Sequence, residues 1–263
     1  MGLFTDPVFK KRESWGYLLA LLIRGCGWTT WVFTGVAVLK LANNSVGCST
    51  KGFEITFNST MNRTQTEEEA DMWEVACTGE IDFFGKAMTP ATSIPFTTAI
   101  GLVISTLVSP IFGAIIDRTT RRKAVTFLSL GVYVAINAFQ ALISEDTYML
   151  ILFLQNILNR IAFALHVSCV AAYCTEIAEG ETEIIALQSA GRVAETGSMV
   201  VTLFSIIIGS AVAGVGDDVV KTAAFGQVLA TVVSLPLMLV CWTMFEERGE
   251  PNHTHPPNTS GPA

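Results

Sequence analysis

Polar side chains inside one long apolar stretch are the strongest candidates for chemistry in this sequence. Arg160 lies near the middle of the stretch, with Gln155, Asn156, Asn159 and His166 close to it. At about 100° per residue, these residues form a polar stripe along one side of a helix. A charged side chain inside a membrane span costs about 2.5 to 3.5 kcal/mol, so each one needs a partner or a watery cavity.

The stripe has two interpretations. In the first, it lines a solute path, in which Arg160 attracts an anionic group such as a carboxylate and His166 titrates near neutral pH. In the second, these groups hydrogen-bond neighbouring helices and hold a bundle together. The path interpretation is preferred for Arg160, whereas a lone histidine is more often structural.

Arg24 is a further candidate path residue, near the centre of another apolar stretch. Its small neighbours Gly25 to Gly27 allow another helix to approach closely. Glu195 is a candidate partner for Arg24. Arg192 and Glu195 are three residues apart and can meet on one side of a helix. Snorkelling to the membrane interface is sufficient to explain that pair, so neither is expected to be a ligand.

The sequence has no pattern typical of an enzyme. It contains no metal-ligand cluster, nucleophile elbow, phosphate loop or pair of catalytic carboxylates, and no cofactor is expected. The net charge is −7, and the few basic residues lie at the ends of apolar stretches rather than in a patch. Nucleic acid is therefore excluded as a partner.

The elements that position these residues are membrane-spanning helices. The chain is 51% hydrophobic and only 15% charged, which is too apolar for an ordinary soluble domain of 263 residues. An apolar helix needs about 20 residues to cross the hydrocarbon core. Six stretches meet this condition, and we expect them at 15–42, 95–116, 124–143, 148–174, 189–215 and 222–245. The prediction is an all-α, polytopic six-helix bundle, integral to the plasma membrane or to a vacuole-like endomembrane.

Basic residues predict the orientation of the bundle. Lys10 to Arg12 and Arg118 to Lys123 are separated by two spans, and the positive-inside rule places both in the cytoplasm. Residues 1–14 are then a cytoplasmic segment, 15–245 the membrane domain, 43–94 an outer loop and 246–263 a disordered cytoplasmic tail. Sequons in the tail, at Asn252 and Asn258, should stay unglycosylated.

The outer loop carries features of an extracytoplasmic segment. Glycosylation sequons occur at Asn43, Asn58 and Asn62, although Asn43 is close to the membrane. Cys48 and Cys77 are in the same polar segment and can form a disulfide if it faces an oxidising compartment. The other four cysteines lie in apolar stretches and are predicted to be small packing residues.

The loop between the second and third spans resembles a motif of major facilitator superfamily transporters. It reads Gly-Ala-Ile-Ile-Asp-Arg-Thr-Thr-Arg-Arg-Lys, and the positions that match the family pattern are Gly113, Asp117, Arg118, Arg121 and Arg122. Thr120 replaces the second glycine of the pattern and resists positive φ. A basic juxtamembrane loop is the alternative.

The resemblance implies the amino-terminal half of a twelve-helix carrier, and a cytoplasmic conformational latch in this loop. Gly113 should let two helices approach, and Asp117 should pair with Arg118 or Arg121 or cap the third helix.

A narrower resemblance comes after the fourth span. Two groups of residues are similar to the autophagy-related vacuolar amino-acid effluxer family: Tyr173, Glu176, Ile177 and Ala178, then Ser189, Gly191, Glu195 and Gly197. Together the two resemblances cover the chain from about Pro95 to Val215.

These observations predict transport of a small solute by alternating access. The resemblances suggest an amino acid or another small organic solute, and a half-length or truncated carrier that pairs with itself or with a second six-helix half. The expected partners are this solute and membrane lipid. The alternative is a non-transporting multi-pass glycoprotein that acts as an adaptor or regulates a full-length transporter.

Overall fold

The computed structural model describes residues 6–47, 79–83, 85–119 and 121–246. Within these residues, six helical spans are long and apolar enough to cross a membrane. They are α1 (Arg12–Ser45), α3 (Pro90–Arg118), α4 (Arg122–Phe139) with the 3-10 turn η2 (Gln140–Leu142), α5 to α6 (Tyr148–Ile177), α7 (Glu181–Val212) and α8 (Val219–Met244). The chain is therefore an all-α, integral multi-pass membrane protein, as the sequence predicts.

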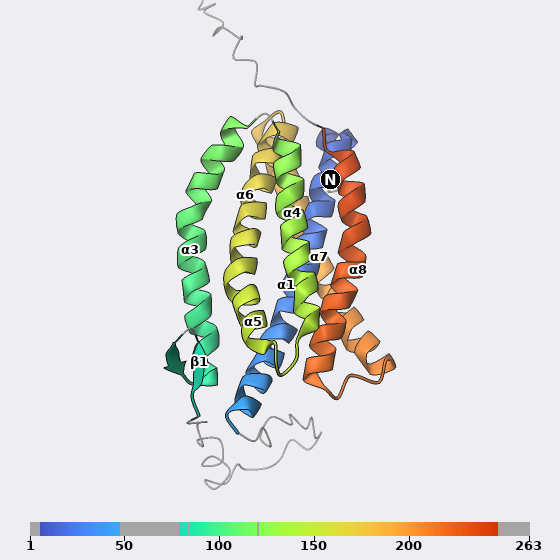
Figure 1. Cartoon of the computed structure of the whole chain (residues 1–263). Coiled ribbons are helices and arrows are strands. Elements are labelled where there is room, and N and C mark those ends of the chain that lie inside the picture. The colour runs from blue at the N-terminus through green and yellow to red at the C-terminus, as the bar shows by residue number, and fades with distance from the viewer. Residues whose placement is uncertain (1–5, 48–78, 84, 120, 247–263) are drawn as a thin grey trace, which may run out of the picture.

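The helix ends agree with the predicted up-and-down order. In Figure 1, the amino-terminal end of α1, the α3–α4 connection, the α6–α7 connection and the end of α8 lie at one end of the bundle. The α4–α5 and α7–α8 connections lie at the opposite end, together with β1 (Figure 1). We call the first the basic end, because it carries Arg118 and Arg121 to Lys123.

Several predicted boundaries change in the structure. The fifth span begins at Glu181 rather than Ser189, because Ile184 and Leu187 pack into the core at the basic end and extend the helix. The segment between the first two spans is shorter than predicted, because α1 continues to Ser45 and α3 begins at Pro90. Before α3, a short antiparallel hairpin pairs β1 (Ile81–Phe83) with β2 (Lys86–Met88).

Helix α1 packs along both α7 and α8, and glycine makes part of this packing possible. A Cβ atom at Gly25 would collide with the Glu195 backbone and the Ser198 hydroxyl of α7. A Cβ atom at Gly27 would collide with the ring of Tyr133 in α4. The predicted close approach at these glycines is therefore confirmed, and it fixes the depth of Arg24 against α7.

The fourth span is not a continuous α-helix. A π-helical turn, η3 (Leu154–Leu158), separates α5 (Tyr148–Phe153) from α6 (Asn159–Ile177). The Asn159 amide donates to the Leu154 carbonyl, five residues earlier. Such a turn inserts one extra residue and rotates the next part of the helix about its axis. The π-turn contains two of the polar residues predicted to form the stripe and ends just before two others.

Candidate functional site

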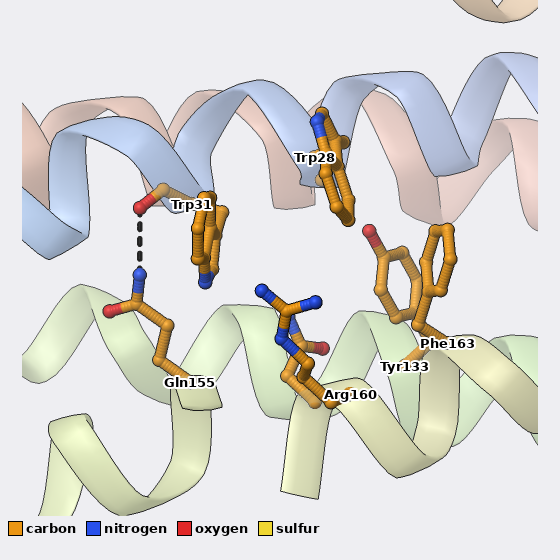
Figure 2. Close-up of a pocket in the computed structure, with 8 residues that line it drawn as sticks. Trp28, Trp31, Tyr133, Gln155, Arg160 and Phe163 are labelled. Atoms are coloured by element: carbon orange, nitrogen blue, oxygen red, sulfur yellow. Dashed lines mark hydrogen bonds between the residues drawn. The ribbon is translucent and has the colours of Figure 1, made fainter. Parts of the chain in front are cut away.

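Arg160 lies in a small hollow between α1, α4 and α6 (Figure 2). Its guanidinium lies over the ring of Trp31, with its carbon 5.2 Å from the ring centroid. The hollow has a volume of about 20 Å³, which is room for one water molecule. Its lining is mostly aromatic and consists of Gly27, Trp28, Trp31, Tyr133, Gln155, Asn159, Arg160 and Phe163.

Arg160 has no acidic partner among the described residues. Its Nε atom is buried and makes no hydrogen bond within this part of the chain. Gln155 and Asn159, the other polar residues of the hollow, are uncharged. The hollow therefore has a net charge of +1 in surroundings where an unpaired cation is costly. An anion that entered it would remove that cost.

Neutral hydrogen bonds hold the sides of the hollow. Gln155 Nε2 donates to the Trp31 carbonyl at 2.7 Å, which links the π-turn to α1 (Figure 2). Asn159 and Asn137 of α4 exchange hydrogen bonds at 3.3 and 3.5 Å. Within the described residues, these contacts leave the Arg160 guanidinium and the buried Gln155 Oε1 atom as polar groups free to bind a solute.

The predicted polar stripe is divided in the structure. Asn156 faces α3, where it donates to the Thr97 hydroxyl at 3.1 Å and accepts from the Thr98 hydroxyl at 3.2 Å. His166 is fully buried and stacks on Tyr133, with ring centroids 6.4 Å apart. Neither residue lines the Arg160 hollow. The prediction assumed a constant rotation of about 100° per residue along the helix. The π-turn interrupts that rotation between Asn156 and Asn159.

Arg24 pairs with Glu195 across α1 and α7. Its Nε and Nη2 atoms donate to the two carboxylate oxygens, each at 2.7 Å. The two side chains are only 6% and 7% exposed. Arg192 donates to the same carboxylate at 3.1 Å and is 78% exposed. The snorkelling explanation was wrong for Glu195, because its carboxylate points into the bundle rather than to the interface.

The predicted latch loop connects α4 to α6 through one of its arginines. Arg122 forms a salt bridge with Glu176, and its Nε donates to the Ile116 carbonyl at 3.1 Å. Arg118 and Arg121 are exposed. The close approach predicted at Gly113 was wrong, because an added Cβ there would meet nothing within 4 Å. The Asp117 side chain and Thr120 are outside the described part of the structure.

No family model, no curated protein and no solved structure matches this chain. The resemblances to the major facilitator superfamily and to the amino-acid effluxers therefore stay predictions. The structure itself establishes the six-helix membrane fold and the geometry around Arg160.

Sequence reasoning missed a second buried amide cluster. Gln227 of α8 donates to the Thr34 hydroxyl at 2.8 Å and to Gln140 Oε1 at 3.1 Å. All three residues are fully buried and join α1, α8 and η2. Asn137 was missed in the same way. The signal was present in each case, because an amide inside an apolar span needs a partner as an ion does.

The predicted modification sites fall largely beyond the described residues. Asn58, Asn62, Cys48 and Cys77 lie outside them, and Asn43 is in the last turn of α1. The cysteines predicted to pack in the spans are buried and free of disulfides, as expected: Cys26, Cys169, Cys174 and Cys241.

Proposed function

We propose that this protein transports a small solute bearing a carboxylate group by alternating access, with Arg160 as the cation that binds it. The observation that carries the proposal is a guanidinium inside a membrane span with no acidic partner among the described residues. Ionisable residues inside membrane spans are rare and commonly mark solute paths. A cation that faces a hollow and has no acidic partner among the described residues fits such a role.

The aromatic lining supports an organic solute rather than a simple inorganic ion. Trp28, Trp31 and Phe163 line the hollow beside Arg160, and its other polar groups are few. Binding sites for small organic molecules combine such apolar surfaces with a few polar groups that set orientation. A carboxylate on Arg160, with an apolar or aromatic remainder on these rings, fits this arrangement.

The small size of the hollow supports a moving site. About 20 Å³ is far below the roughly 300 Å³ at which ligand pockets begin. A solute can bind only if α1 and α6 separate, or if further protein surface completes the site. Both requirements agree with alternating access between two six-helix units, which is what the major facilitator resemblance of the Gly113 to Lys123 segment implies.

The test is uptake into proteoliposomes of a panel of radiolabelled amino acids, monocarboxylates and dicarboxylates. For any solute that the wild-type protein moves, Arg160→Gln should reduce uptake roughly ten- to a hundredfold, the value of a charge-assisted hydrogen bond. Arg160→Lys should retain part of the activity, because it keeps the charge but loses the planar fork. The matched control is Lys10→Gln, which removes an exposed charge at the basic end.

Equal reconstitution of the variants must be verified, for example by quantitative immunoblotting. Uptake unchanged by Arg160→Gln would remove Arg160 from the site. If the wild-type protein moves no member of the panel, the adaptor or regulator hypothesis replaces transport.

A further inference from the structure

A second hollow lies between α1, α6 and α7, nearer the basic end. It has a volume of about 300 Å³, and its polar lining comes from Tyr17, Arg24, Gln188 and Arg192. This volume is at the lower limit of small-molecule sites. The second hollow is thus large enough for a small organic acid without any rearrangement.

The charges around the second hollow do not balance. Arg24 and Arg192 supply two positive charges, and both donate to the single carboxylate of Glu195. The net charge is therefore +1. Arg24 is fixed by two hydrogen bonds of 2.7 Å, whereas Arg192 makes one of 3.1 Å and is 78% exposed. Arg192 is consequently the cation that can turn to a new anion while Glu195 stays neutralised by Arg24.

Phe163 connects the two hollows, because its ring lines both. On one side it contacts the Arg24 guanidinium, whose carbon is 5.5 Å from the ring centroid. On the other side it packs on Trp28, with centroids 5.2 Å apart. Arg160 precedes Phe163 by one helical turn. A solute leaving the second hollow past this ring would reach Arg160.

We propose that the second hollow is a carboxylate subsite on the same solute path, with Arg192 as its principal ligand and Gln188 as a second donor. The carboxylate of the bound solute takes the place of the Glu195 carboxylate on Arg192, and Arg24 keeps Glu195 in position. This inference rests on the proposed function for its biological meaning. The subsite itself is a binding property and can be measured without transport.

The test is equilibrium binding of radiolabelled benzoate to the purified full-length chain in detergent. The measurement is made in an Arg160→Gln background, which removes the first cation. This protein should still bind benzoate saturably, and neutral benzamide of the same shape should not displace it. Adding Arg192→Gln should weaken benzoate binding tenfold or more, Arg192→Lys should weaken it less, and Lys10→Gln should change it less than twofold.

The proposal is overturned if the Arg160→Gln protein shows no saturable benzoate binding, if benzamide competes as well as benzoate, or if Arg192→Gln acts no more strongly than Lys10→Gln. Size-exclusion profiles verify that each variant is folded, and an Arg160→Met background, which also removes the first cation, provides a second series if Arg160→Gln is unstable. If the wild-type protein transports a solute but Arg192→Gln does not weaken benzoate binding, the subsite is refuted and the transport proposal stands. Arg192-dependent binding without any uptake would refute the transport proposal alone.

Discussion

Removing Glu195 should destabilise the protein more than removing its principal partner, Arg24. Glu195→Gln leaves the Arg24 guanidinium, 6% exposed, without an anion. Arg24→Gln is less severe, because Glu195 keeps the hydrogen bond from Arg192 at 3.1 Å. Arg24→Gln would be the more destabilising of the two changes only if Arg192 did not help to stabilise the Glu195 carboxylate.

The magnitudes derive from the geometry of the pair. Breaking a buried ion pair costs about 3 to 5 kcal/mol, and Glu195→Gln should lie in this range. Arg24→Gln should cost about 1 to 3 kcal/mol, because one charge-assisted hydrogen bond survives. The double variant replaces both ions with amides that can bond each other. Its cost should therefore be at least about 2 kcal/mol below the sum of the single variants.

The measurement is the free energy of unfolding in mixed micelles, from titration with sodium dodecyl sulfate. Arg192→Gln is the control for an exposed charge and should cost less than about 1 kcal/mol. The conclusion that this pair supports the contact between α1 and α7 would be refuted by either of two results. One is a cost below about 1 kcal/mol for Glu195→Gln, and the other is a double-variant cost equal to the sum of the two single-variant costs.

Two further predictions concern the ends of the bundle. Lys11 Nζ contacts Glu179 at 2.8 Å, which raises the pKa of Lys11 above 10.5 and lowers the pKa of Glu179 below 4.5. The contact should therefore hold between those pH values, weaken as pH falls through the pKa of Glu179 or rises through that of Lys11, and be absent in Lys11→Met. The mobility of a spin label in the segment 7–10 measures this, and mobility unaffected by Lys11→Met would contradict it. The predicted orientation gives the second prediction: Asn58, in the predicted outer loop, should carry a glycan and Asn252, in the predicted cytoplasmic tail, should not, as a gel shift after N-glycosidase treatment shows. A glycan on Asn252 would reverse the predicted orientation.

Apolar length and charge placement made the spans predictable. A run of about 20 apolar residues has few alternatives to a membrane helix, so all six spans were predicted with errors of a few residues at most ends. The start of the fifth span was the largest error. Its first three residues, 181–183, include two glutamates, which hid the start of the helix, whereas Ile184 and Leu187 pack in the core at the basic end.

The site was predictable in composition but not in arrangement. Arg160 was identified because a charge in a span is conspicuous, and Glu195 was considered as a partner for Arg24 for the same reason. A helical wheel could not place Asn156, because the π-turn is a local backbone feature with no clear sequence signal. The small residues Gly25 to Gly27 predicted the close approach at Arg24, but the sequence did not show that α7 is the helix that approaches, so the Arg24 and Glu195 contact stayed one candidate pairing.

The long separation of Arg24 and Glu195 along the chain has a consequence for biosynthesis. The two residues are 171 positions apart, so Arg24 enters the membrane well before its partner exists. At about 5 to 20 residues per second, the delay is on the order of ten to thirty seconds. During this time the first span carries an unneutralised arginine and is a marginal insertion substrate. Its release from the insertion machinery should therefore wait for the fifth span, so a protein of this design is exposed to quality control for most of its synthesis.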